Sequence, residues 1–227
     1  MLALGLSIVI ATPAPAQPLT GVLKRIKDSG EITLGHRDAS VPFSYLDDRQ
    51  QPVGYSMDLC LRVVDAVKAE LKLPALKVIY NPVTSANRIP LIANGTIELE
   101  CGSTVNNVER QAQVAFSDTT FIVSTQLHRQ TRRQSQDAGR PARQDGAEAY
   151  SIDPYALMLP RGDAAFKALV DRALVEYFRS GALMATYDKW FAKPIPPRGV
   201  TLNFPLSAPL RKAFATPTDS PDPASYE

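Results

Sequence analysis

The sequence predicts an α/β fold in which crossover helices connect the strands of a parallel sheet. Between residues 32 and 101, short apolar strands alternate with segments of helical periodicity, in the order strand, helix, strand, helix, strand. Right-handed crossovers around a parallel sheet are the usual outcome of this order. The chain has 227 residues, 44% of them hydrophobic, which suffices for one large domain or two small ones. Its formal net charge of +2 argues against a general polyanion binder, so we expect no nucleic acid among its partners.

The first sixteen residues have the pattern of a signal peptide. An apolar run over residues 2–11 is too short to span a bilayer, and Ala14-Pro15-Ala16 precedes Gln17 as a signal-peptidase site would. We therefore expect residues 1–16 to be removed on export to the periplasm. A positively charged n-region is absent, which leaves open the true start codon and the alternative of a short buried helix.

The next elements follow from local signals. Thr20 is the expected N-cap of a short helix that Gly30 ends, and the first strand follows at once. A hairpin is expected between Val41 and Tyr55, because residues 47–52 separate Phe43 and Tyr45 from Val53 and Tyr55, and its aromatic residues are expected to form a wall near the sheet end. Ser56 is expected to cap the first crossover helix, whose buried face carries Leu59, Val63, Val67 and Leu71.

The stretch 100–110 predicts the end of one strand, a tight turn and the start of a helix. Gly102 marks the turn, and Asn106 is the expected N-cap, with Glu109 reaching back to the cap as in a capping box. Free amides and the positive helix end favour a carboxylate or phosphate here, and Arg110 adds a fixed charge. For this segment alone, an ordinary capped helix with a solvated arginine remains the alternative.

Two other strands of the predicted sheet end in the same way. Arg37 ends the strand that begins at residue 31, and Arg88 lies in the helix start that follows the strand 77–80. Ligands of open parallel sheets gather outside the carboxyl ends of the strands. We therefore expect Arg37, Arg88 and Arg110 to converge, and three arginines without obvious partners indicate an anionic ligand.

Several of these motifs carry a family resemblance. They are His36-Arg37, Val41-Pro42-Phe43-Ser44, Gly54-Tyr55-Ser56, Thr84-Ser85, Asn87-Arg88-Ile89-Pro90-Leu91, Asn94-Gly95-Thr96, Glu100-Cys101-Gly102-Ser103-Thr104, Asn106-Asn107-Val108-Glu109-Arg110-Gln111, Phe116-Ser117-Asp118, Lys189-Trp190-Phe191 and Pro194-Ile195-Pro196-Pro197. Together they resemble the periplasmic glutamate/aspartate-binding proteins of ABC importers, in solute-binding protein family 3. The resemblance covers roughly residues 19–127 and 150–214. It implies a type II periplasmic-binding-protein fold, a monomer, an acidic amino acid as ligand and a membrane permease as partner.

The resemblance also implies roles for individual residues. The expected ligand-binding residues are Arg37, Ser85, Arg88, Ser103, Val105 and Arg110. Arg110 and the turn at Ser103 would bind the α-carboxylate, and the first three residues of the set would bind the side-chain carboxylate. Val105 departs from the family, which often has threonine there, so only its backbone amide remains available as a donor.

The chain departs from a complete family member after residue 127. Residues 128–149 contain no Val, Ile, Leu, Met, Phe, Trp or Tyr, so they cannot build a core and have the composition of a disordered linker. In the family, the strands that flank this point cross to and from a second lobe. We therefore expect the first lobe to begin at 19–118, crossing strands and a truncated second lobe at 119–159, and C-terminal helices of the first lobe at 160–215.

Helical periodicity returns in the last third of the chain. Residues 166–177 and 187–191 predict two helices separated at Gly181, and residues 206–214 predict a last short one. The tail, residues 216–227, is rich in Pro, Ser and Asp and is expected to be frayed and flexible.

Other chemistry finds little support in the sequence. Cys60 and Cys101 are the only cysteines, and a disulfide and two buried free thiols both remain open. His36 and His128 are the only histidines, so we expect neither a metal site, nor a cofactor, nor a catalytic residue. Two alternatives to a binding protein remain: a dehydratase-like enzyme on a related fold, and a degenerate, non-binding product of a deleted or frame-shifted gene.

Overall fold

The computed structural model describes residues 19–126 and 149–227. The expected signal peptide and nearly all of the expected linker lie outside those ranges. Within them, no helix is both long enough and apolar enough to cross a membrane.

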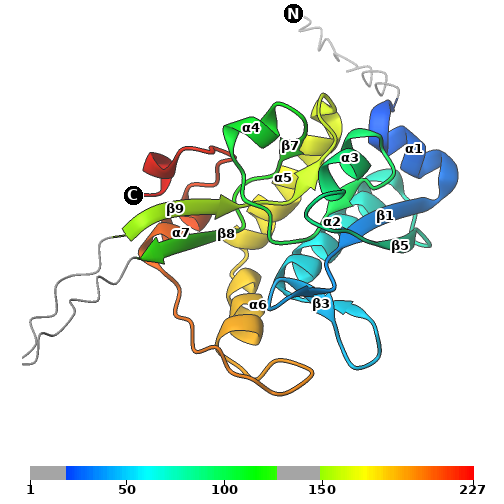
Figure 1. Cartoon of the computed structure of the whole chain (residues 1–227). Coiled ribbons are helices and arrows are strands. Elements are labelled where there is room, and N and C mark those ends of the chain that lie inside the picture. Colours follow the sequence, from blue (N-terminus) through cyan, green and yellow to red (C-terminus); the bar gives the residue numbers. More distant parts are fainter. Residues whose placement is uncertain (1–18, 127–148) are drawn as a thin grey trace, which may run out of the picture.

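Helices and strands alternate one by one only between residues 55 and 116 of the described chain, and elements of one kind follow one another before and after (Figure 1). The helices are α1 Gly21–Ser29, α2 Tyr55–Leu71, α3 Arg88–Ala93, α4 Val108–Gln111, α5 Ala164–Arg179, α6 Ala182–Phe191, α7 Ala208–Ala215 and the 3-10 helix η1 Pro223–Tyr226. The strands are β1 Glu31–His36, β2 Ala39–Ser40, β3 Ser44–Leu46, β4 Pro52–Val53, β5 Lys77–Pro82, β6 Leu99–Glu100, β7 Ala115–Phe116, β8 Phe121–Gln126, β9 Ala149–Tyr155 and β10 Met158–Leu159. The expected hairpin (β3 and β4) and the helices on either side of Gly181 are present.

A five-stranded sheet organises the molecule, in the order β5-β1-β6-β10-β7. β1 pairs in parallel with both β5 and β6, as the strand and helix order predicts. β10 is antiparallel to its neighbours β6 and β7, so the sheet is mixed and not wholly parallel. The antiparallel strand arises because β10 belongs to the returning chain, a direction that local sequence patterns do not specify.

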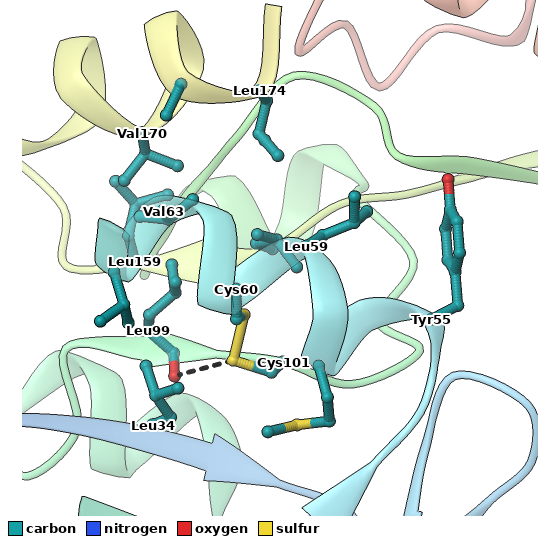
Figure 2. Packing of buried hydrophobic residues seen from close by; sticks show 14 of the residues in the cluster. Leu34, Tyr55, Leu59, Cys60, Val63, Leu99, Cys101, Leu159, Val170 and Leu174 are labelled. Carbon is teal, nitrogen blue, oxygen red and sulfur yellow. Dashed lines mark hydrogen bonds between the residues drawn. A yellow bond between two sulfur atoms is a disulfide. The ribbon is translucent and has the colours of Figure 1, made fainter. Parts of the chain in front are cut away.

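Apolar layers cover both faces of this sheet. On one face, Leu34, Leu99 and Leu159 of the strands lie beneath helices α2 and α5, and all three are fully buried (Figure 2). The other face carries a smaller cluster, in which α3 contributes Ile92 and the strands contribute Phe116 and Met158. Successive side chains of a strand point to opposite faces of the sheet. Leu159 therefore belongs to the larger cluster and its neighbour Met158 to the smaller one.

β8 and β9 form a separate two-stranded ribbon that extends away from the sheet (Figure 1). Phe121 pairs with Tyr155 at its base, and the ring of Phe121 stacks on Phe191 of α6 at 5.0 Å between centroids. A returning strand was expected at the end of the segment 119–159. It is instead divided, because the chain leaves the ribbon after Tyr155 before it enters the main sheet as β10.

Two expected helix caps differ in the structure. α2 begins two residues earlier than expected, with Gly54 as N-cap, and the hydroxyl of Ser56 donates to the carbonyl oxygen of Gly102 at 2.7 Å. Thr20 is the N-cap residue of α1, but its side chain makes no capping bond. The carboxylate of Asp163 takes that role, because it accepts a hydrogen bond from the backbone amide of Val22 at 2.6 Å.

The C-terminal tail is packed and not frayed as expected. We call residues 216–227 the C-terminal clasp. The carbonyl oxygen of Thr218 accepts a hydrogen bond from the amide of Thr119, and that of Asp219 accepts one from the side chain of Asn106. Tyr226 is 1% exposed, and its hydroxyl lies 2.6 Å from the hydroxyl of Thr119. One buried aromatic ring thus anchors a segment whose overall composition suggests disorder.

Candidate functional site

Three arginines meet where the parallel strands end. Arg37 follows β1, Arg88 begins α3 after β5, and Arg110 lies in α4 after β6. Burial lowers the pKa of Arg88; Glu100 opposes this effect, while the charges of Arg110 and Arg37 add to it. Contacts with residues 102–105 agree with this. A Cβ atom at Gly102 would lie 3.2 Å from Arg37 Cγ. Arg88 donates to the hydroxyl of Thr104, and Arg110 donates to the carbonyl oxygen of Val105. The structure therefore brings the three arginines together.

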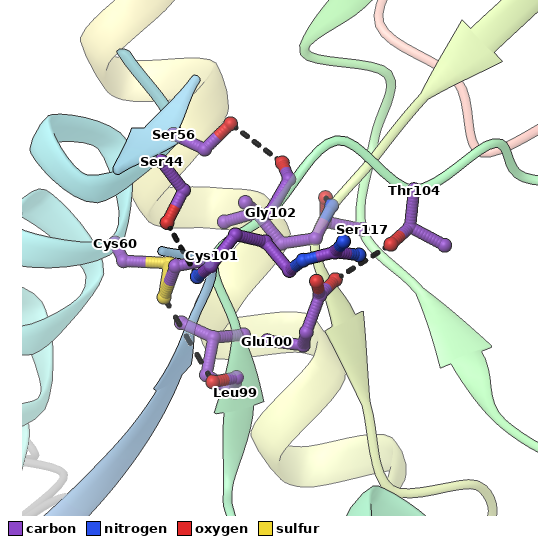
Figure 3. The surroundings of a disulfide bond; sticks show 11 residues. Ser44, Ser56, Cys60, Leu99, Glu100, Cys101, Gly102, Thr104 and Ser117 are labelled. Atoms are coloured by element: carbon purple, nitrogen blue, oxygen red, sulfur yellow. Dashed lines mark hydrogen bonds between the residues drawn. A yellow bond between two sulfur atoms is a disulfide. The ribbon is translucent and has the colours of Figure 1, made fainter. Parts of the chain in front are cut away.

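A buried carboxylate lies among these arginines, and sequence reasoning gave it no role. Glu100 is fully buried, and its Oε2 accepts a hydrogen bond from the hydroxyl of Thr104 at 2.9 Å (Figure 3). Arg88 Nη1 donates to the same hydroxyl and lies 3.9 Å from Glu100 Oε1. Burial raises the pKa of Glu100, and the charge of Arg88 opposes the rise. Arg88 thus has an internal partner, contrary to the expectation that it had none.

Two polar atoms of this buried pair remain unsatisfied. Within the described ranges, neither Arg88 Nε nor Glu100 Oε1 has a hydrogen-bond partner. Unpaired buried polar atoms cost roughly 1–3 kcal/mol each, and they are concentrated at functional sites. The strand pattern of residues 96–101 could have indicated Glu100, because it places an acid at the end of β6. The turn of residues 101–107 follows, and we call it the binding turn because it contains the expected ligand-binding residues Ser103 and Val105.

The other two arginines are half-buried and therefore closer to solvent. Arg37 Nη1 donates to the exposed hydroxyl of Ser85 at 3.1 Å, which joins two of the expected site residues. Arg110 Nη1 donates to the carbonyl oxygen of Val105 at 2.7 Å, which joins two others. Within the part of the chain that the structure describes, each of these guanidinium groups has one hydrogen bond, to a neutral oxygen, so its charge remains available to an anion.

The start of α4 is one residue later than expected. Asn107, not Asn106, is the N-cap, and its side chain accepts a hydrogen bond from the amide of Arg110 at 2.9 Å. Asn106 is buried and is bonded instead to the clasp and to Gln111. Glu109 is exposed and forms no capping box with Asn106. In an Asn-Asn pair, sequence alone cannot decide which residue caps, and with only four residues α4 contributes little dipole.

The binding turn between β6 and α4 is held from α2. Cys60 of α2 and Cys101 form a disulfide, which decides between the two alternatives left open by the sequence (Figure 3). The next residue, Gly102, accepts the hydrogen bond from Ser56. A Cβ atom at Gly102 would lie 2.1 Å from Glu100 Oε1, so any larger residue would displace the carboxylate.

The far side of the turn lies against the ribbon. Val105 pairs with Tyr155 of β9 through an isolated antiparallel bridge. Ser103, two residues earlier, is half-buried in the same turn. The expected residues of the turn therefore lie between α2 on one side and β9 on the other.

Of the three aromatic residues expected between Val41 and Tyr55, only Phe43 is partly exposed. Tyr45 and Tyr55 are buried, and their hydroxyls donate to the carbonyl oxygens of Pro196 and Thr120. Phe43 remains half-buried and contacts the ring of Tyr155 at 5.3 Å between centroids. Burial raises the pKa of Tyr155, as does the charge of Asp153, whereas Arg88 and Arg110 oppose the rise. Tyr155 is therefore a neighbour of the arginines that sequence reasoning missed.

A metal site was not expected from the sequence, which contains only two histidines. His36 is buried, and no group of three or more His, Cys, Asp or Glu side chains in residues 19–126 and 149–227 is placed to hold a metal ion.

An α/β sheet with arginines gathered at its strand ends is an arrangement to which a small anionic solute can bind. The chain belongs to the bacterial extracellular solute-binding proteins, family 3, because the family model matches residues 32–193. The resemblance seen in the sequence motifs is thereby confirmed.

Two bacterial relatives are similar to almost the whole chain. The L-glutamate/L-aspartate-binding protein of Pseudomonas aeruginosa is 40% identical over 281 aligned positions, which cover 93% of each chain. The glutamate/aspartate import solute-binding protein of Salmonella typhimurium is 34% identical over 289 positions, which cover 96% of each chain. Both alignments are longer than the 227 residues of this chain, so both relatives contain residues for which this chain has none.

Solved structures share the fold. An ancestral amino acid-binding protein described as a precursor of cyclohexadienyl dehydratase has a TM-score of 0.58 and 16% identity, over 75% of this chain and 99% of that one. A mutant of the arginine-bound form of domain 1 from TmArgBP has a TM-score of 0.50 and 20% identity, over 70% of this chain and 99% of that one. The expected α/β fold of the periplasmic-binding-protein type is confirmed.

Proposed function

We propose that this chain is the periplasmic solute-binding component of an amino-acid ABC importer and that it binds glutamate or aspartate through its one retained lobe. The convergence of Arg37, Arg88 and Arg110 at the carboxyl ends of three neighbouring strands is the observation that carries the proposal. The printed names of the two relatives support the choice of an acidic amino acid over other anions. A membrane permease is the partner that this function requires.

Two subsites follow from the contacts around the arginines. Arg110 and the turn from Ser103 to Val105 bind the α-carboxylate, with the Val105 amide as a further donor. Arg37 and Ser85, which are already hydrogen-bonded to each other, bind the side-chain carboxylate together with Arg88. The buried Glu100 holds Arg88 through Thr104, so this arginine keeps a fixed orientation when no ligand is bound.

The proposed binding is weak because most of the second lobe is missing. The alignments with both relatives are longer than this chain, which supports the loss of a segment from it. Half-buried ion pairs that remain open to water contribute about 0–1 kcal/mol each, whereas desolvated pairs contribute more. The arginine-bound form of domain 1 from TmArgBP supports the idea that a single lobe of this fold can hold an amino acid. We propose a monomer, since one lobe carries all of the ligand contacts.

Titration calorimetry with glutamate, aspartate and glutamine tests the proposal. We expect weak binding of the two dicarboxylates, weaker binding of glutamine and a loss of affinity at high salt. Arg110→Ala should abolish binding, because it removes the charge of one subsite. Arg179→Ala is the matched control, since Arg179 is an exposed arginine at the end of α5 and should leave affinity unchanged.

Two outcomes would contradict this function. Absence of binding at millimolar ligand would favour a degenerate product of a deleted or frame-shifted gene. Turnover of keto or cyclic acids would favour a dehydratase-like enzyme instead, but we propose no catalytic residue. The acid that lies among the arginines, Glu100, is fully buried and so is poorly placed to exchange protons with a substrate.

A further inference from the structure

The positive charge of the proposed site is unfavourable for one group of an amino-acid ligand. An amino acid brings an ammonium group as well as carboxylates, and three converging arginines repel that group. Glu100 cannot accept it, because the carboxylate is 0% exposed and already faces Thr104 and Arg88. Unless another acid lies near the site, dicarboxylates without an amino group should bind better than amino acids do. The inference that follows rests on the proposed function.

Asp153 is an acid in a suitable position. It lies on β9 two residues before Tyr155, and alternate residues of a strand point to the same face. Tyr155 pairs with Val105 of the binding turn on one side and with Phe121 of β8 on the other. Two residues along a strand span about 7 Å. Asp153 therefore lies on the same face of β9 as Tyr155, about 7 Å along the strand from the residue that pairs with Val105. Val105 belongs to the turn that is proposed to bind the α-carboxylate.

The electrostatics of Tyr155 agree with this placement. The charge of Asp153 raises the pKa of Tyr155, and the charges of Arg88 and Arg110 lower it, after the larger effect of burial. The phenol ring thus lies within range of the acid and of both arginines. Asp153 itself is half-buried, so its carboxylate is both accessible to a ligand and partly shielded from water. The hydroxyl of Ser151 donates to its Oδ2 at 3.1 Å, which restricts the orientation of the group.

We propose that Asp153 accepts the α-ammonium group of the bound amino acid and so makes the one-lobed site selective for acidic amino acids over plain dicarboxylates. The contact joins the ribbon to the ligand, whereas the carboxylates are bound by the sheet and the turn. Asp153 is then a specificity-determining residue, because the ligand's carboxylates would still bind without it.

Comparison of glutamate with glutarate isolates this contact. Glutarate has the same two carboxylates and the same number of carbon atoms but no ammonium group. We expect wild type to bind glutamate more tightly than glutarate, and Asp153→Asn to weaken glutamate binding by about three- to tenfold while leaving glutarate unchanged or slightly tighter. Asp188→Asn, at an exposed acid of α6, is the matched control and should change neither affinity.

The outcomes separate this inference from the proposed function. Equal effects of Asp153→Asn on glutamate and glutarate, or no preference for glutamate in wild type, would overturn the role of Asp153 and leave dicarboxylate binding intact. Absence of binding by both ligands in wild type would overturn the proposed function itself. Retained glutarate binding by Asp153→Asn also establishes that the variant is folded.

Discussion

The five-stranded sheet and the two-stranded ribbon are stabilised in different ways. The sheet is covered on both faces, and residues such as Ile32, Leu34 and Leu99 are completely buried. The ribbon has only β8 and β9, and a two-stranded unit alone is marginally stable in water. Its base is held by aromatic rings of α6 and by the C-terminal clasp. The proposed carboxylate subsites thus rest on a complete core, whereas the proposed ammonium contact rests on a segment held by parts distant in sequence.

Loss of the disulfide should have the largest effect on stability, and it should fall on the sheet. Cys60 and Cys101 close a loop with a sequence separation of 41, for which chain-entropy models give about 4 kcal/mol. We expect the double variant Cys60→Ala with Cys101→Ala to lower the free energy of unfolding by about that amount in urea denaturation. Wild type in reducing agent should show a similar loss. A change below about 1 kcal/mol would mean that core packing alone maintains the sheet and the binding turn.

Removal of the clasp's anchor should affect the ribbon more than the sheet. Tyr226 is buried and its ring fills space beside the ribbon, so Tyr226→Ala should cost about 3 kcal/mol. Hydrogen exchange measured residue by residue should show the largest acceleration at the amides of Thr119 and Thr120 and in β8 and β9.

A conservative variant separates the ring of Tyr226 from its hydroxyl. Tyr226→Phe keeps the ring and removes two hydrogen bonds of the hydroxyl, one with Thr119 and one to the carbonyl oxygen of Ser220, so it should cost about 2 kcal/mol. Uniform acceleration of exchange across sheet and ribbon in Tyr226→Ala would show that the two regions unfold as one unit.

The smallest effect is expected at the junction of the two regions and depends on pH. Burial raises the pKa of Asp118 to about 6, with Asp171 and Asp219 adding to the rise and Lys167 opposing it. Because the folded state favours the protonated acid, Asp118 contributes most to stability below its ordinary pKa of 3.8, and this contribution is lost as the pH rises through about 6. At neutral pH the ionised group is therefore unfavourable.

Asp118→Asn should consequently stabilise the protein at pH 7.5 by about 1–2 kcal/mol, a value reduced for partial exposure, and should have little effect at pH 3.5. Denaturation at the two pH values gives the comparison. An equal gain at both would show that the change acts through packing and not through the charge of Asp118.

Several elements could be predicted from local signals in the sequence. Helical spacing predicted α2, α5 and α6, and Gly30 and Gly181 marked helix boundaries as expected. The carboxyl ends of neighbouring parallel strands lie at the same edge of a sheet, and this rule predicted from sequence that Arg37, Arg88 and Arg110 lie close together. These features were predictable because each depends on residues a few positions apart, or on a general property of parallel sheets.

The groups that these residues contact could not be predicted without the folded structure. Glu100 lies beside Arg88 because a short parallel strand places its side chain beneath α3, and Asp163 replaces Thr20 as the cap of α1 across 141 positions of sequence. The clasp is ordered because Tyr226 enters a buried position near Thr119. Such contacts join segments that are far apart in the chain, and their energies depend on burial and on charges from several elements at once. No local pattern encodes them, which is why the arginines were found from sequence and their partners were not.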